Sequence, residues 1–211
     1  MNKVAAIGVS LAFASRALAS LVFGEYADAT AFRTTLTGES FTESFASFKY
    51  GPAESGTYNW GGGAFAITGD ADDGVFFGGH DAIDREFLTT AEDTGIRITF
   101  TAGNPTAIGG RFFGTTADDS RADASLHFIF SDGSVFDLTS SSTPANDFWG
   151  FWSASRGAVE WMRLSTSTTG AYVGIDDLTV GYAAIPEPST YAGALGVGIL
   201  IVVGIRHRRR R

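Results

Sequence analysis

Short runs of alternating apolar and polar residues fill the middle of the chain, and glycine or aspartate separates one run from the next. Alternation with a period of two indicates strands that bury one face. Residues 96–100 alternate strictly, and Asn104-Pro105 ends the pattern. Similar runs predict further strands at residues 63–68, 74–77, 107–113, 147–152, 159–165 and 172–181. With roughly eight to ten strands and little room for helix, the pattern is typical of an all-β sandwich or barrel.

One hairpin stands out among these predicted strands. Residues 126–130 and 135–138 flank the sequence Ser-Asp-Gly-Ser, in which Asp132-Gly133 is a favourable two-residue turn. In that register Phe130 faces Val135 and Ile129 faces Phe136, which places apolar groups on both faces. We therefore expect the hairpin to lie inside a sheet and not at its edge.

Residues 40–48 are ambiguous. Ser40 and Glu43 have the spacing of a helix capping box, and Phe41, Phe45 and Phe48 follow at helical spacing. A short helix or a strand satisfies this pattern equally.

The N-terminus has the features of a secretory signal peptide. A basic start at Lys3 precedes a mainly apolar stretch over residues 4–13, and Ala17-Leu18-Ala19 before Ser20 is a small-residue cleavage site. We expect residues 1–19 to be removed, with Ala27-Asp28-Ala29 as a weaker alternative site.

The C-terminus combines an apolar stretch with a basic end. Residues 191–205 carry no charge, but 15 residues at about 1.5 Å each reach only about 22 Å, short of the ~30 Å hydrocarbon core. Five arginines follow, which disfavours a buried core helix and keeps this end on the cytoplasmic side of a membrane. These stop-transfer residues are Arg206, Arg208, Arg209, Arg210 and Arg211. The pattern predicts a short transmembrane helix that forms a thin anchor.

The end of the chain resembles a known sorting signal. Pro186-Glu187-Pro188-Ser189-Thr190, the apolar stretch and the arginine cluster occur in the order of the PEP-CTERM signal of Gram-negative bacteria, over residues 185–211. This resemblance implies recognition of Pro186, Glu187 and Pro188 by an exosortase, cleavage nearby, and passage from the inner membrane to the cell surface or extracellular matrix. It also implies association with exopolysaccharide and biofilm.

The block from residue 107 to residue 181 also resembles the globular part of many PEP-CTERM proteins. The similarity lies in Ala107–Gly114, the Ser131–Ser134 turn, Phe148–Phe151 and Tyr172–Thr179. It implies a jelly-roll-like, lectin-like antiparallel β-sandwich, which by itself does not establish sugar binding.

Residues 20–184 are long enough for one domain with a core. This segment carries eight basic and 22 acidic side chains, a formal charge of −14, because the terminal arginines and Glu187 lie outside it. Such a field repels nucleic acid, so we expect no nucleic-acid partner, although solubility alone is a sufficient reason for the charge. The chain has no cysteine, which excludes disulfides and thiolate chemistry.

Closely spaced carboxylates occur at one glycine turn. Asp70, Asp72 and Asp73 lie between Gly69 and Gly74, and Ca²⁺ takes several oxygens in flexible geometry. The spacing is not that of an EF-hand, so an ordinary acidic turn is the competing interpretation. Asp118-Asp119 and Asp176-Asp177 are similar pairs, and no other cofactor is indicated.

Aromatic residues suggest a possible carbohydrate contact, because flat rings stack on sugar rings. The set comprises Trp60, Trp149, Phe151, Trp152 and Trp161. Most aromatic residues are core residues, but Trp60 is expected on a loop, and one side of the strand with Trp149 and Trp152 could be exposed. We take Trp60, Trp149 and Trp152 as the candidates.

No catalytic constellation is evident. Glycoside hydrolysis needs two facing carboxylates, and no pair is singled out; Glu160 is the only strand-borne glutamate beside an aromatic residue. His80-Asp81 is interpreted as a solvated pair on a loop, and His127 as an ordinary residue of a sheet. The sequence contains no nucleophile elbow, zinc-protease motif or phosphate-binding motif. We expect a non-enzymatic surface protein, with signal peptidase, exosortase and extracellular polysaccharide as partners. A carbohydrate-active enzyme and a purely structural matrix protein are the alternatives.

Overall fold

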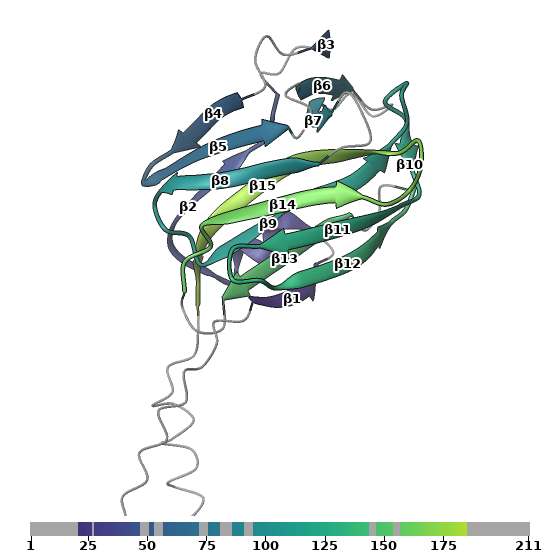
Figure 1. Ribbon diagram of the computed structural model, residues 1–211. Coiled ribbons are helices and arrows are strands. Elements are labelled where there is room, and N and C mark those ends of the chain that lie inside the picture. Colours follow the sequence, from purple (N-terminus) through teal and green to yellow (C-terminus); the bar gives the residue numbers. More distant parts are fainter. Residues whose placement is uncertain are drawn as a thin grey trace, which may run out of the picture.

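The computed structural model describes residues 21–26, 28–46, 51–52, 57–71, 76–80, 86–90, 95–143, 147–153 and 157–184. This part of the chain forms an antiparallel sandwich of two sheets with one short helix (Figure 1). The predicted all-β antiparallel sandwich is confirmed. The expected signal segment, residues 1–19, and C-terminal segment, residues 185–211, lie outside the described residues.

The larger sheet has nine strands. Its main path runs β1-β13-β9-β15-β7-β6-β3, with β10 paired to β9 and β2 paired to β15. The bounds are β1 (Leu21–Glu25), β2 (Leu36–Glu43), β3 (Gly51–Pro52), β6 (Phe76–His80), β7 (Glu86–Thr90), β9 (Ala107–Thr115), β10 (Arg121–Ala122), β13 (Phe148–Ser153) and β15 (Tyr172–Ala183).

The smaller sheet has six strands in the order β12-β11-β14-β8-β5-β4, and it lies in front in Figure 1. Its strands are β4 (Thr57–Gly62), β5 (Phe65–Ala71), β8 (Ile96–Ala102), β11 (Ala124–Phe130), β12 (Val135–Ser140) and β14 (Trp161–Thr166). Alternate residues are buried along β5 and β11, as expected for strands with one face on a core.

Each predicted strand has a counterpart in the structure, but several strands had no clear alternating pattern, including β1, β4 and β7. The ambiguous segment from Ser40 is a strand through Glu43, so the capping-box pattern does not mark a helix. Instead, the Glu43 carboxylate accepts a hydrogen bond from the Phe45 backbone N–H at 2.9 Å. Phe45 is fully buried at a positive φ of 53°.

The predicted hairpin forms, but its register is shifted by one residue. Ile129 pairs with Val135 and Phe128 with Phe136. The turn has three residues, because the Gly133 N–H donates to the Phe130 carbonyl at 2.9 Å and Gly133 adopts a φ of 83°. The shift leaves Val135 50% exposed, and β12 is an edge strand. The expected interior position of the hairpin is therefore wrong.

Phenylalanine rings fill the space between the sheets. Phe151 from the larger sheet lies 5.0 Å from Phe128 and 4.8 Å from Phe130, measured between ring centroids. Phe112 meets Phe128 edge-on at 5.1 Å. All four side chains are fully buried, so burial of large aromatic rings is the main source of stabilisation here.

The helix α1 (Ala29–Arg33) packs on the outer face of the nine-stranded sheet. The Asp28 carboxylate caps it by accepting from the Ala31 N–H at 2.8 Å. Its one buried side chain, Phe32, lies over Gly109 and Gly150, where an added Cβ would come within 2.7 and 2.5 Å of the ring. These glycines are needed for close approach, and Phe32 closes this part of the larger sheet to solvent.

The first and last strands of the described sandwich, β1 and β15, come close to each other near Thr106. Its carbonyl accepts from the N–H of Ser153, the register partner of Leu21, and its N–H donates to Gly181 near the end of β15. The chain therefore enters and leaves the sandwich at the same end (Figure 1). Within the described residues, no helix has both the length and the apolar character needed to cross a membrane.

Candidate functional site

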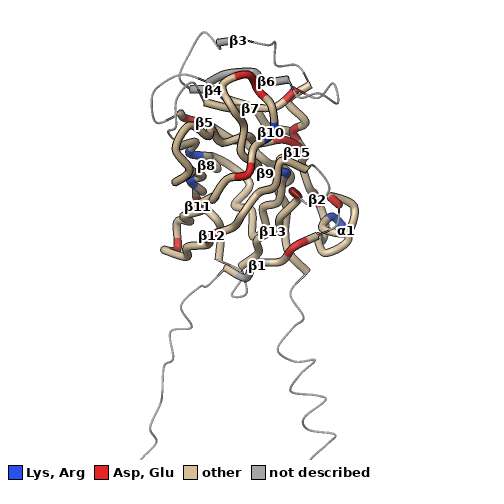
Figure 2. Tube along the Cα trace, turned by 90° about the vertical axis from the view of Figure 1, so that its right-hand side faces the viewer, with Lys and Arg blue, Asp and Glu red and all other residues tan. Residues whose placement is uncertain are grey.

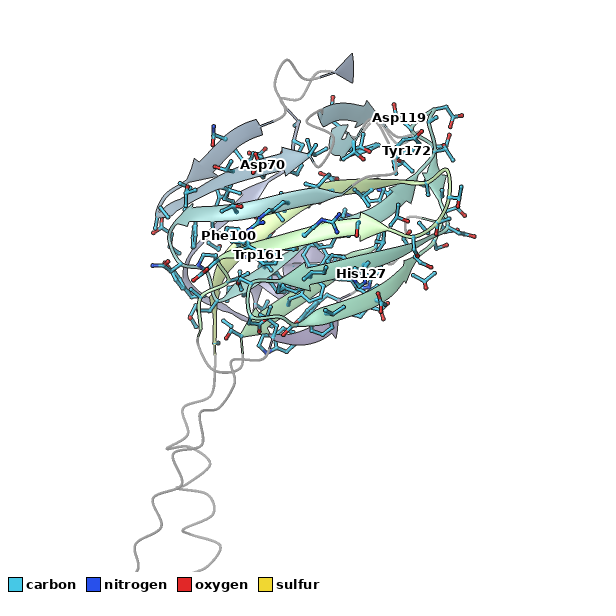
Figure 3. The ribbon with its side chains drawn as sticks, viewed as in Figure 1. Asp70, Phe100, Asp119, His127, Trp161 and Tyr172 are labelled. Carbon is cyan, nitrogen blue, oxygen red and sulfur yellow. The ribbon has the colours of Figure 1, made fainter. Side chains whose placement is uncertain are left out.

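The outer face of the six-stranded sheet carries the polar residues that alternate with the core positions. On the central strand β14, Met162 and Leu164 point into the core, so Trp161, Arg163 and Ser165 lie on the outer face. Figure 3 shows Asp70, Trp161 and His127 spread across this sheet from β5 to β11. We call the outer face of the six-stranded sheet the polar face.

Trp161 is held on the polar face by an arginine. It pairs with Thr99 on β8, and the Arg97 guanidinium lies 4.4 Å from the centre of its ring. A cation over a tryptophan ring is attracted by the electrons of the ring face. Trp161 is half-buried and Arg97 is exposed, so the pair presents an aromatic surface and hydrogen-bond donors side by side.

A row of charged residues crosses the middle of the same face. Antiparallel register places Asp70 on β5 opposite Arg97 on β8, and Arg97 opposite Arg163 on β14. Arg163 also donates to the hydroxyl of Ser165 at 3.3 Å. In Figure 2, basic positions gather beside β8 on the side of the six-stranded sheet. Two arginines are thus neighbours in an otherwise acidic molecule.

Further polar groups flank this row. On one side, the Thr68 hydroxyl donates to the Asn59 side chain at 2.7 Å. On the other side, His127 Nδ1 and the Asp137 carboxylate are 2.5 Å apart, and their side chains are 37% and 78% exposed. The polar face thus carries donors and acceptors on the same surface as one half-buried tryptophan, which is the composition of a site that recognises a polar ligand with an apolar face.

The three tryptophans chosen from the sequence lie in three different places. Trp60 is on β4, not on a loop, and its half-buried ring meets Phe45 edge-on at 5.7 Å. Trp149 is only 4% exposed and belongs to the core. Trp152 is half-buried against Tyr26, 6.3 Å away between ring centroids. The expected exposure of Trp60 as a loop residue and of Trp149 on an open strand face is wrong, because both rings pack on the core.

The acidic turn is described only at its first residue. Asp70 lies on β5, and its register partner is Arg97, whereas Asp72 and Asp73 lie outside the described residues. Among the residues that the structure describes, no three histidine or acidic side chains are grouped to hold a metal ion. Calcium binding at this turn stays a prediction.

The other acidic pairs have structural partners. Thr116 donates a hydrogen bond to Asp118, and this bond is the main reason why the pKa of Asp118 lies below its ordinary value. Asp177 contacts Arg111 at 3.4 Å, and its neighbour Asp176 is buried within a bulge of β15. Both pairs shape turns or bulges of the larger sheet.

A buried ionic cluster that the sequence did not reveal lies on the larger sheet. Asp147, just before β13, is 3% exposed and contacts Arg111 at 2.6 Å and also Arg121. The Arg121 guanidinium lies 3.7 Å from the centre of the Phe113 ring. The only sign of this cluster in the sequence was Arg111, a charged residue among the apolar residues of β9. Within the cluster, the Asp147 carboxylate contacts both arginines, so each charge has a partner of opposite sign. We interpret the cluster as structural.

The remaining candidate residues do not form a reaction centre in the described part of the chain. Glu160 is exposed and precedes β14, where its N–H donates to Ser131 at 3.0 Å. Asp132 lines a pocket with room for about one water molecule, and its carboxylate accepts from the Leu21 N–H at 3.1 Å. The other candidate pair was His80-Asp81. His80 is the last residue of β6, and Asp81 lies outside the described residues.

Comparison with solved structures gives distant matches, two of which are described here. No protein-family model matches the chain, and no curated protein matches its sequence. A family 29 carbohydrate-binding module from Piromyces equi matches with a TM-score of 0.34 and 11% identity, over 69% of this chain and 93% of that one. CtCBM11 matches with a TM-score of 0.33 and 9% identity, over 69% and 95%. At these TM-scores the likeness is too low to transfer a site or a ligand from either protein.

Proposed function

We propose that this chain is an exported, non-enzymatic protein that binds a polysaccharide on the polar face of its six-stranded sheet. The observation that carries the proposal is Trp161, half-buried at the start of the central strand β14 with Arg97 over its ring. A sugar has apolar ring faces and a rim of hydroxyls, so an aromatic ring beside charged and amide groups matches both parts of its surface.

The polar face suits an extended ligand. Threonine and serine occupy several positions around the charged row, among them Thr68, Thr99 and Ser165. Trp161 and the two arginines are larger side chains that lie among these short ones. A polymer can lie across the strands, which are about 4.8 Å apart, and contact several of them in turn.

The positions of the carboxylates favour binding over glycoside hydrolysis. Among the residues that the structure describes, Asp70 on β5 and Asp137 on β12 are the two aspartates in the register rows of the polar face. Four strand intervals separate them, which is about 19 Å at 4.8 Å per interval. A glycosidase pair lies no more than about 10 Å apart, so these two groups are too far apart to act on one bond.

A purely structural matrix protein has no need for an aromatic ring on a polar face. The core is already filled by Phe112, Phe128, Phe130 and Phe151, so Trp161 adds little to it. The cation–π contact with Arg97 fixes the ring in one orientation, which lowers the entropy lost when a ligand binds. Both points favour a binding role.

Export and sorting are part of the proposal. The predicted cleavage before Ser20 lies one residue before β1, and Pro186 lies three residues after the end of β15. Cutting at these two places leaves every strand of the described sandwich intact. Because both chain ends leave the sandwich at the same end, a C-terminal anchor would hold the domain by that end and leave the polar face to one side.

The test is a glycan array probed with the full-length chain in mild detergent, with and without Ca²⁺. We expect binding to extended polysaccharide fragments, with loss of signal in a Trp161→Ala variant that keeps its melting temperature. A Trp152→Ala variant is the matched control, because Trp152 packs on the opposite sheet against Tyr26. If no glycan gives a signal under either condition, the binding role is refuted. A signal that requires Ca²⁺ would point to the acidic turn at Asp70.

A further inference from the structure

We infer that the polar face binds a neutral, extended polysaccharide that lies across the strands of the six-stranded sheet; this inference rests on the proposed function. It comes from one row of side chains that begins at the tryptophan and contains no ionisable group. Trp161 on β14 pairs with Thr99 on β8. Thr68 on β5 pairs with Thr99 on one side and with Asn59 on β4 on the other. We call these four residues the neutral row.

The neutral row lies on the outer face of the sheet. Ile67 and Ile98, which precede Thr68 and Thr99, are buried in the core, so the two threonines point outward. Asn59 is exposed, and the Thr68 hydroxyl donates to its side-chain oxygen at 2.7 Å. This hydrogen bond holds both polar side chains in place, which lowers the entropy lost when a ligand binds them.

The chemistry of the neutral row suits an uncharged sugar. Hydroxyl and amide groups both donate and accept hydrogen bonds, as sugar hydroxyls do. The charged side chains belong to the next row, where Asp70 lies opposite Arg97 and Arg163 donates to Ser165. Residues 20–184 hold 22 acidic side chains against eight basic ones, so the field around the domain repels an acidic polysaccharide. Both features favour a neutral ligand.

The neutral row has a definite length. At one end, the Trp161 carbonyl accepts from the N–H of Ser131, the first residue of the hairpin turn, at 3.1 Å. At the other end, Asn59 lies on the edge strand β4 (Figure 1). Three strand intervals separate Trp161 from Asn59, which is about 14 Å at about 4.8 Å each. A pyranose ring is comparable in length with one interval, so about three to four sugars cover the row.

The residues beside the neutral row favour a path across the strands. On the side away from the charged residues, Gly61 on β4 and Ala66 on β5 are register partners. Their small side chains do not obstruct a ligand that lies on the row. Along β14, in contrast, the next outward side chain after Trp161 is the long Arg163. A ligand that contacts Trp161 therefore extends more easily toward Asn59 than along the strand.

The experiment is calorimetric titration of the full-length chain with cello-, manno-, galacto- and xylo-oligosaccharides, each as the disaccharide, tetrasaccharide and hexasaccharide. Oligogalacturonates of the same lengths are the acidic probe. In the neutral series that binds best, the tetrasaccharide should bind at least about tenfold more tightly than the disaccharide, which is about 1.4 kcal/mol. The hexasaccharide should gain less than about threefold more, because the row ends at an edge strand. The acidic tetrasaccharide should bind at least about tenfold more weakly than the neutral one.

Three variants locate the effect. Asn59→Ala should lower tetrasaccharide affinity about fivefold and change disaccharide affinity less than about twofold, because a disaccharide on Trp161 does not reach β4. Thr68→Val removes the hydroxyl at nearly constant volume and should act in the same way. Thr139→Ala is the matched control, since Thr139 is exposed on β12, the opposite edge strand, and its loss should change neither affinity. The melting temperature shows that each variant is folded, and a general structural defect would lower both affinities equally.

The outcomes separate this inference from the proposed function. Equal affinity for the disaccharide and the hexasaccharide would overturn the path along the neutral row and leave glycan binding intact. Tetrasaccharide affinity that is unchanged in both folded row variants would overturn it as well. An oligogalacturonate that binds as tightly as the best neutral series would overturn the claim of a neutral ligand. Failure of every oligosaccharide to bind would refute the proposed function itself.

Discussion

Asp147 joins three parts of the larger sheet, and its replacement by asparagine should destabilise the sandwich strongly. Its carboxylate contacts Arg111 of β9 and Arg121 of β10 directly before β13 begins, and its side chain is 3% exposed. Asparagine keeps the shape but removes the charge, which leaves two arginines without it. Breaking a buried pair costs about 3–5 kcal/mol. For a domain of this size, each kcal/mol lowers Tm by about 2–4 °C, so the expected fall is roughly 6–20 °C.

Thermal unfolding followed by circular dichroism measures this effect, and urea titration gives the free energy of unfolding. Asp137→Asn is the matched control, because Asp137 is 78% exposed beside His127 and exposed pairs contribute about 0–1 kcal/mol. The double variant Asp147→Asn with Arg121→Met should recover part of the loss, since one uncompensated charge is removed. A loss below about 1 kcal/mol in Asp147→Asn would refute the view that this cluster stabilises the sheet.

Three further predictions concern packing and processing. Gly150→Ala should lower stability by about 1–3 kcal/mol in urea titration, because the new methyl group would overlap the Phe32 ring, and an unchanged midpoint would show that α1 does not need this close approach. Mass spectrometry of the exported protein should place the mature N-terminus at Ser20, since cleavage after Ala29 would remove β1, and a start at residue 30 would contradict this. Alanine replacement of Pro186-Glu187-Pro188 should abolish release from the membrane fraction in immunoblots, and normal release would exclude the sorting role.

Many of the strands were predictable from the sequence, whereas β1, β4 and β7 and the register of the hairpin were not. The sequence over residues 126–130 indicates a strand with apolar groups on both faces, and the structure buries only the face with Leu126, Phe128 and Phe130. Asp132-Gly133 fits both a two-residue turn and a three-residue turn that ends in a glycine at positive φ. The choice between them moved Val135 from the expected face, which it would share with Phe128 and Phe130, to the opposite face, where it is 50% exposed. The conformation of Gly133 therefore sets the register of β12, and with it the face on which each side chain of that strand lies.

The candidate site shows a similar limit. Trp149 looked available because its strand carries aromatic residues on both faces, but its ring points with Phe151 into the core between the sheets. The other face of the strand is covered by Phe32 from α1, which is distant in sequence. Trp161 had a usable signal: Met162 and Leu164 form an apolar alternation that assigns Trp161 to the polar face together with Arg163. The opposition of Arg163 and Arg97 required the strand order, which the sequence does not contain.

Calorimetric comparison of the native chain with Trp161→Ala, using the glycan that binds best, tests the central claim most directly. A tryptophan at the centre of an interface typically contributes 2 kcal/mol or more, so we predict a loss of affinity of roughly 30-fold or more. The melting temperature should stay nearly constant, because Trp161 lies on the outer face and not in the core. An unchanged affinity in a folded Trp161→Ala protein would contradict the assignment of the polar face as the glycan-binding surface.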